Sequence, residues 1–231
     1  GLSAGCYTTN SAELCFYVAD HSESEIVVVD TVKNLEKFLA HEKDLKRVKQ
    51  FVLYLEDVPA AIKAKHSNVV SLDDFLAQGN ATPVAAVDKR IAALNPRHAC
   101  TLIYTSGTTG NPKACMISHD SMMFIGTTGI ESTEMYKDSG DQDIISYLPM
   151  SHIAAQVADV GFPILFTSQY NSNCTISFGR PDALKGSLPI TLKAVQPTIF
   201  FGVPRVWEKF VEGIKTKAKA APAKGAKLHL V

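Results

Sequence analysis

The segment YTSGTTGNPK, residues 104–113, gathers within ten positions the groups that can hold a polyphosphate. Gly107 and Gly110 have no Cβ, so the backbone N–H groups around them can turn toward a ligand. Serine and threonine hydroxyls supply further donors, and Lys113 supplies a positive charge. The candidate binding residues are Thr105, Ser106, Gly107, Thr108, Thr109, Gly110 and Lys113. A plain polar turn has the same composition, so the residue types alone leave both interpretations open.

The segment differs from the two most familiar nucleotide-binding motifs. A Walker A loop has glycine directly before its lysine, and this chain has Pro112 there. The dinucleotide fingerprint GxGxxG does not occur in the segment either. We therefore expect neither a Walker A site nor a dinucleotide site at these residues.

The elements around the segment alternate between strand-like and helix-like patterns. This alternation predicts an α/β fold of layered parallel sheets with flanking helices. In the first half, the β-branched run at 26–30 predicts a strand buried on both faces, and 51–55 predicts a second strand. A helix at apolar helical spacing is predicted between them, and further helices at 11–20 and 69–79.

The second half repeats the alternation after an alanine-rich connector at 80–96. We expect this connector to be exposed, partly helical, and the boundary between two portions of one large domain, 1–96 and 97–231. The predicted strands are 99–104, 114–117, 144–148, 174–178 and 198–203, and the predicted helices include 152–166, 182–195 and 207–214. The polyphosphate segment thus follows a strand directly.

Composition excludes several classes of protein. The 231 residues carry 23 basic and 23 acidic side chains, so no basic excess favours nucleic acid, and 46% hydrophobic residues suffice for a core. No apolar run approaches the roughly 20 residues of a transmembrane segment. Five cysteines without a CxxC pair argue against zinc or a disulfide framework and favour a reducing compartment. We expect a cytoplasmic protein, with peripheral attachment to the endoplasmic reticulum or another lipid membrane left open.

Residues 104–113 resemble the phosphate-binding signature YTSGTTGxPKG of the adenylate-forming, or AMP-binding, superfamily. All ten positions match, and the next, usually glycine, is Ala114. Four other segments resemble the superfamily in the same order along the chain. They are GCYTTNS at 5–11, IVVVD at 26–30, YLPMSHI at 147–153 and FGVPRVWEK at 201–209. The sequences of these motifs are most similar to those of the bubblegum-type long-chain acyl-CoA synthetases. The resemblance covers roughly residues 1–215.

The resemblance implies a long-chain fatty acid–CoA ligase. Such an enzyme joins a fatty-acid carboxylate to the α-phosphate of ATP, releases pyrophosphate, and passes the acyl group to CoA with release of AMP. Residues 105–113 would hold the β- and γ-phosphates, assisted by Mg²⁺. His152 would lie beside the carboxylate and the α-phosphate as a hydrogen-bond donor; the alternative is a structural histidine at a helix start. Gly202 would let the acyl chain approach closely; the alternative is a strand-to-helix turn.

The resemblance also implies an N-terminal piece of a longer enzyme, the incomplete large domain of the adenylate-forming fold. The superfamily's later motifs do not occur here: the YGxTE-like segment, the ribose-binding aspartate, the hinge, and the small C-terminal domain with its lysine. The acidic residue of the first of these helps to hold Mg²⁺, so we assign no metal ligand in this chain. We expect the chain alone to be inactive. The alternative function is a non-catalytic module that binds nucleotide or acyl chain, or only an interaction partner.

Overall fold

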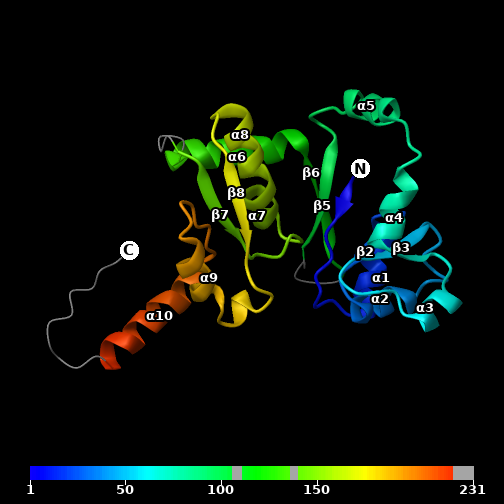
Figure 1. Cartoon of the computed structure of the whole chain (residues 1–231), viewed down its shortest axis with the longest axis horizontal. Helices are drawn as coiled ribbons and strands as arrows, with labels where there is room; N and C mark the ends of the chain where they lie inside the picture. Colours follow the sequence, from blue (N-terminus) through cyan, green and yellow to red (C-terminus); the bar gives the residue numbers. More distant parts are fainter. Residues whose placement is uncertain (106–110, 136–139, 221–231) are drawn as a thin grey trace. The chain divides into compact units, whose positions relative to one another are not determined.

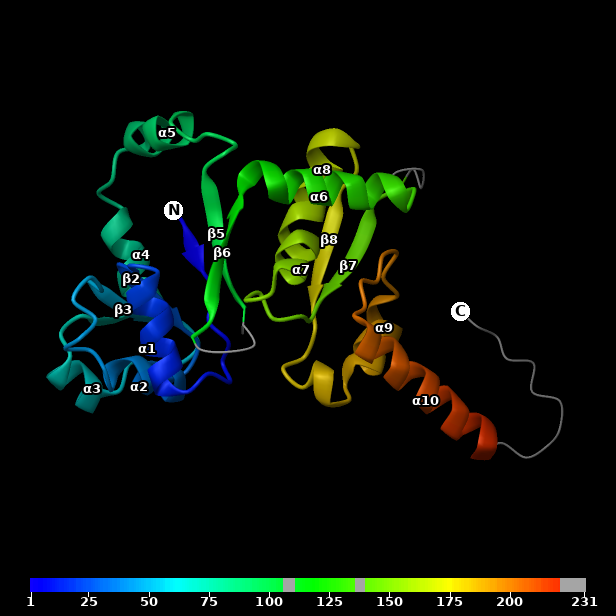
Figure 2. The same ribbon diagram turned by 180° about the vertical axis from the view of Figure 1, so that it is seen from behind.

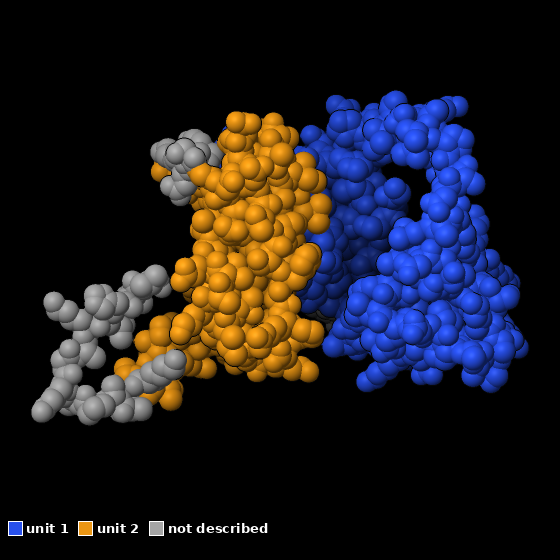
Figure 3. Space-filling model, in the orientation of Figure 1, with its two compact units in different colours: residues 1–132, 148–157 blue, residues 133–147, 158–231 orange. Residues whose placement is uncertain are grey.

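The computed structural model describes residues 1–105, 111–135 and 140–220 (Figure 1). The chain forms two compact units (Figure 3). The first unit comprises residues 1–132 and 148–157, and the second comprises residues 133–147 and 158–231. The boundary expected at residue 96 stays a prediction.

The first unit contains a three-stranded parallel sheet in the order β2–β3–β4 (Figure 1). Its strands are β2 (Ile26–Val29), β3 (Gln50–Leu53) and β4 (Val69–Ser71). Phe51 of the central strand lies opposite Val27 on one side and Val69 on the other. These three side chains are buried and begin the main core of the unit.

The helix predicted at 69–79 is wrong at its start, because residues 69–71 form β4. Four helices precede, connect or follow these strands and cover the sheet, and the one at 60–65 was not predicted. They are α1 (Ala12–His21), α2 (Val32–Leu39), α3 (Ala60–Lys65) and α4 (Leu72–Gly79). The hydroxyl groups of Ser11, Thr31 and Ser71 cap α1, α2 and α4 by accepting a backbone N–H from the first turn. The helices contribute Cys15, Ala19, Leu35 and Phe38 to the core.

Strand β2 differs from the prediction that residues 26–30 are buried on both faces. Val27 and Val29 are buried, but Ile26 is 45% exposed and Val28 is 55% exposed. The prediction is wrong because β2 lies at the edge of its sheet and only alternate side chains point into the core. The central strand β3 has the pattern that was expected of β2, since Phe51, Val52 and Leu53 are all buried.

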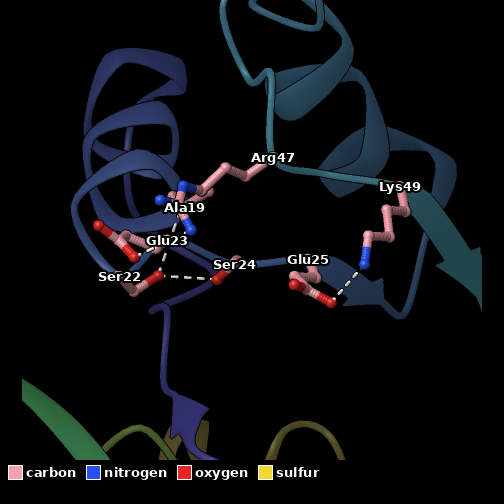
Figure 4. A network of polar contacts seen from close by, with 7 residues as sticks. All are labelled: Ala19, Ser22, Glu23, Ser24, Glu25, Arg47 and Lys49. Carbon is pink, nitrogen blue, oxygen red and sulfur yellow. Dashed lines mark hydrogen bonds and ion pairs between the residues drawn. The ribbon is translucent and has the colours of Figure 1, made fainter.

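Polar contacts hold the turn that leads from α1 into β2 (Figure 4). Arg47 pairs with Glu23 at 3.1 Å, and Lys49 pairs with Glu25 at 2.8 Å. Ser22 at the end of α1 donates its hydroxyl to a carbonyl of that helix. All four charged side chains are well exposed, so water and salt screen both pairs and neither contributes much to stability.

The first unit has a second sheet, in the order β1–β5–β6 (Figure 2). Its strands are β1 (Ser3–Ala4), β5 (Ala99–Thr105) and β6 (Lys113–Ser118). Strand β1 is parallel to β5, but β5 and β6 form an antiparallel hairpin. The two strands were predicted from the sequence, but their antiparallel pairing departs from the purely parallel layers that we expected. Helix α6 (His119–Ser132) follows β6 and is capped by Ser118.

The connector between the two sheets contains helix α5 (Val84–Ala92), and every residue of that helix is exposed. This confirms the expectation of a partly helical, exposed connector. Among the described residues, no helix is both long and apolar enough to cross a membrane.

The second unit pairs β7 (Gln142–Ser146) with β8 (Cys174–Phe178) in a parallel two-stranded sheet. Helix α8 (Phe162–Gln169) packs on β8, and α9 (Leu188–Val195) packs on β7. Helix α10 (Pro204–Ala220) follows. A small core joins buried Ala183, Leu188 and Val206 to the side chains of Tyr147, Leu192, Phe200, Val203 and Phe210.

Two predicted helices are interrupted. The expected helix 152–166 consists of α7 (Ile153–Gln156), a π-helical turn (Val157–Gly161) and α8. Pro163 accounts for the wide turn, because it has no N–H and its ring would clash with a carbonyl four residues earlier. The expected helix 182–195 is divided by Gly186, whose φ of 145° is left-handed.

The predicted strand 198–203 is reduced to a single bridge. Ile199 pairs with Ile144 of β7, and Thr198 Oγ1 accepts the N–H of Asp143 at 2.9 Å. Beyond this point the ring of Phe200 stacks on Tyr147, with centroids 5.6 Å apart. The chain then turns into α10, so this aromatic packing takes the place of further strand pairing.

Candidate functional site

The described ends of the glycine-containing segment are the facing ends of two strands. Thr105 of β5 lies opposite Lys113 of β6, and Tyr104 lies opposite Ala114. Both Thr105 and Lys113 are exposed. The candidate residues Ser106, Gly107, Thr108, Thr109 and Gly110 lie outside the described residues. The structure therefore brings together the first and last of the predicted phosphate-binding residues as cross-strand partners.

Helix α1 holds both ends of this loop. The Tyr17 hydroxyl donates to the backbone oxygen of Pro112 at 3.0 Å, just before β6. On the other side of the loop, the Tyr104 hydroxyl lies 3.0 Å from His21 Nδ1 and donates to the backbone oxygen of Val18 at 3.4 Å. Burial raises the pKa of Tyr104, so this hydroxyl keeps its proton at neutral pH. The loop is consequently anchored to one helix on each side.

Sequence reasoning missed Tyr17 and His21. The two rings stack, with centroids 5.2 Å apart, and both meet the ring of Tyr104. Their spacing of four residues puts them on one face of α1, which is the only signal that the sequence offers. Nothing in that spacing tells which distant strand the face meets.

Ala114 stands where the superfamily signature usually has glycine. Its side chain packs against a small cluster formed by Val18, Leu102 and Tyr104. The methyl group therefore contributes to the contact between α1 and the hairpin.

His152 caps helix α7. Its Nδ1 accepts the backbone N–H of Ala154 at 3.1 Å, and the backbone N–H of His152 donates to the carbonyl oxygen of Pro149 at 2.9 Å. A neutral ring that accepts at Nδ1 carries its proton on Nε2. The side chain is exposed, and across the described part of the chain Nε2 has no partner. The structure thus shows His152 as a structural histidine at a helix start. The ring still has one N–H donor, and its role beside the carboxylate and the α-phosphate stays a prediction.

The motif at 5–11 meets the motif at 147–153 directly. A Cβ added to Gly5 would lie 2.7 Å from Cα of Ser151, which is buried. A glycine is required at this position because the obstacle is backbone and cannot turn away. Gly5 therefore fixes the position of Ser151, the residue before His152, and sequence reasoning gave no sign of this contact.

We expect Gly5→Ala to destabilise the first unit by about 1–3 kcal/mol, because the added methyl group forces the two backbones apart. Urea denaturation of the 231-residue chain, followed by circular dichroism, measures the change. Gly79→Ala is the matched control, since a Cβ at Gly79 meets nothing within 4 Å. Equal stability of the two variants would contradict the proposed contact.

Gly202 lies in the second unit, and its near neighbour is an aromatic side chain. Trp207 Nε1 donates to the Gly202 carbonyl at 2.9 Å, and a Cβ on Gly202 would lie 2.7 Å from that nitrogen. Trp207 itself is 49% exposed. Within this unit the indole ring of Trp207 thus fills the space beside Gly202, and Gly202 lies in the turn that leads into α10. The predicted approach of an acyl chain stays a prediction.

Metal ligands were not predicted for this chain. Among residues 1–105, 111–135 and 140–220, no three histidine, cysteine or acidic side chains gather as a metal site would require.

The fold and motifs define the class of protein. The family model described as AMP-binding enzyme matches residues 2–231, so the chain belongs to the AMP-binding enzyme family. This confirms the family that the sequence motifs indicated.

The curated relatives include two with closely similar sequences. The chain is 42% identical over 227 residues to the long-chain-fatty-acid–CoA ligase ACSBG2 of Xenopus laevis. It is 42% identical over 219 residues to the long-chain-fatty-acid–CoA ligase ACSBG1 of Homo sapiens. These matches cover 98% and 94% of this chain, which spans 29% of the length of each relative.

Solved structures confirm the predicted fold. The adenylation domain of the carboxylate reductase from Mycobacterium chelonae matches 98% of this chain with a TM-score of 0.68 and 18% identity, over 35% of its own length. The corresponding domain from Segniliparus rugosus, solved with AMP and a co-purified carboxylic acid, matches 98% with a TM-score of 0.66 and 18% identity, over 37% of its length. The α/β chain therefore has the fold of part of an adenylate-forming domain.

Proposed function

We propose that this chain is part of a long-chain fatty acid–CoA ligase in which residues 105–113 hold the β- and γ-phosphates of ATP. The observation that carries the proposal is the hairpin, because Thr105 and Lys113 face each other and α1 holds both ends of the loop. Such a loop can close on a polyphosphate and later release pyrophosphate. The similarity to two fatty-acid–CoA ligases supports fatty acid, ATP and CoA as the substrates.

The first chemical step brings a carboxylate anion to a polyanion. Its transition state therefore needs positive charge and hydrogen-bond donors placed in advance. Lys113 supplies a charge at the exposed start of β6, and Thr105 supplies a hydroxyl directly opposite it. The backbone N–H groups between them complete the phosphate contacts in this proposal.

His152 takes the second role, beside the reacting carboxylate and the α-phosphate. Its Nδ1 is occupied by the helix cap, so only the Nε2–H is available to donate. The cap also fixes the orientation of the ring, which reduces the cost of placing a donor at the reaction centre. Gly202 is proposed to lie near the acyl chain, with the indole of Trp207 hydrogen-bonded to its carbonyl oxygen.

Mg²⁺ accompanies ATP in this proposal and would neutralise charge on the phosphate oxygens. The described residues offer no cluster of ligands for it, so no residue of this chain is assigned to the metal. A cytoplasmic location is part of the proposal, supported by five cysteines that are all free. Peripheral attachment to the endoplasmic reticulum or another lipid membrane remains the alternative.

A chimera tests the function. The aligned 227 residues of this chain replace their counterpart in the Xenopus laevis ligase, and formation of AMP and acyl-CoA is measured with ATP, Mg²⁺, CoA and a long-chain fatty acid. We expect turnover by the chimera and none by the 231-residue chain alone, because the chain spans 29% of that relative. A folded chimera without activity would overturn the ligase assignment.

A non-catalytic module that binds nucleotide or acyl chain is the second candidate. It predicts that the chain alone binds ATP or a fatty acid although the chimera is inactive. Calorimetric titration of the chain with each compound separates the two functions.

A further inference from the structure

Two thiols lie side by side in the first unit, one in the segment that precedes helix α1 and the other on that helix. The sulfur atoms of Cys6 and Cys15 are 3.7 Å apart. Cys15 is on α1 and only 2% exposed, whereas Cys6 is partly exposed and lies in irregular backbone. The remaining cysteines are Cys100, Cys115 and Cys174. Sequence spacing did not suggest the pair, since nine positions separate the two residues without a CxxC pattern.

The surroundings favour a thiolate on Cys6. Hydrogen bonding from Cys15, followed by the bond from Asn10 Nδ2 at 3.4 Å and the charge of Lys37, lowers the pKa of Cys6 to about 7 against the opposing effect of burial. The same contact with Cys6, together with burial, raises the pKa of Cys15. One thiol is therefore ready to react, and the other is held as a protonated neighbour.

We propose that Cys6 and Cys15 are a peroxide-sensitive pair that closes to a disulfide. The Cys6 thiolate attacks one oxygen of hydrogen peroxide, the O–O bond breaks, the other oxygen leaves as hydroxide, and Cys6 becomes a sulfenic acid. The Cys15 sulfur then attacks the Cys6 sulfur, the S–OH bond breaks, and the departing hydroxide takes the Cys15 proton as water. Overall, two thiols lose two electrons and two protons, and one peroxide becomes two waters.

The geometry allows this closure with a small movement. A disulfide needs the sulfurs at about 2.05 Å, so they must approach by less than two ångströms. Cys15 is held on α1, so the Cys6 side chain, which lies outside the helices and strands, has to supply this movement. The bond would close next to Gly5, which lies against Ser151.

The test uses the folded 231-residue chain with stoichiometric hydrogen peroxide. We expect the titratable thiols to fall from five to three, with a mass loss of two hydrogen atoms and a Cys6–Cys15 cross-linked peptide. Cys6→Ser and Cys15→Ala should each prevent that loss, and Cys15→Ala should leave a Cys6 sulfenic acid that dimedone traps. Cys100→Ser is the matched control and should still form the disulfide.

Circular dichroism establishes that each variant is folded. Asn10→Ala leaves both thiols in place, and it should slow the reaction about threefold or more because a donor to the Cys6 sulfur is lost. The proposal is overturned if peptide mapping places the disulfide at other cysteines. It is equally overturned if the urea-unfolded chain forms it as fast as the folded chain.

Discussion

His152→Asn in the chimeric ligase is expected to lower kcat for the adenylation step by roughly 100-fold, the usual effect of losing one donor at a developing charge. Asparagine is a good N-cap and can accept the Ala154 N–H as the imidazole does. The variant should therefore fold normally and bind ATP normally while releasing pyrophosphate slowly. Pre-steady-state pyrophosphate release and ATP protection against heat measure the two effects separately.

His152→Ala is the companion variant. It loses both the donor and the cap, so we expect the same loss of kcat together with about 1 kcal/mol of lost stability. If His152→Asn keeps full activity while His152→Ala loses stability, the histidine is a helix cap and has no chemical role. The pair of variants thus separates the two interpretations that the sequence left open.

Lys113→Ala is expected to lower kcat/KM for ATP at least tenfold. A hydrogen bond to a charged group contributes about 1.5–3 kcal/mol, and roughly 1.4 kcal/mol corresponds to a factor of ten. Lys113 is exposed at the start of β6, so its removal should leave the fold intact. Steady-state kinetics at varied ATP concentration, with fatty acid and CoA in excess, measure the change in kcat/KM for ATP.

Cys115→Ala is the matched control, because it replaces an exposed side chain on the same strand two residues further on. It should leave ATP kinetics unchanged. If Lys113→Ala shows the same ATP kinetics as this control, the assignment of residues 105–113 to the phosphate site is wrong.

Strands and helix starts were the most predictable parts of the fold. The strand at 174–178 has the predicted limits, and Ser11, Ser71 and Ser118 cap helices as their residue type favours. These features depend on neighbours within a few residues. The antiparallel β5–β6 hairpin was not anticipated, although the connection of residues 106–112 is too short for the crossover that parallel strands need.

The candidate site was predictable where a motif is continuous along the chain. Thr105 and Lys113 belong to one such segment, and the structure makes them cross-strand partners. Tyr17, His21 and Gly5 support the site from elsewhere, and each acts through a contact that residue type does not encode. The exposed face of β2 shows a similar limit, because a β-branched run does not tell whether a strand will be central or at an edge.

The anchoring of the hairpin by α1 has a consequence for the order of folding. Strands β5 and β6 are adjacent in the chain, so their pairing is a local event that can occur early. The bonds from Tyr17 to Pro112 and from His21 to Tyr104 span 95 and 83 residues. Contacts of such sequence separation carry a large loop-closure cost and form late. During synthesis α1 leaves the ribosome long before the hairpin exists, and the ends of the glycine-containing loop become fixed only when the earliest and later parts of this unit finally dock.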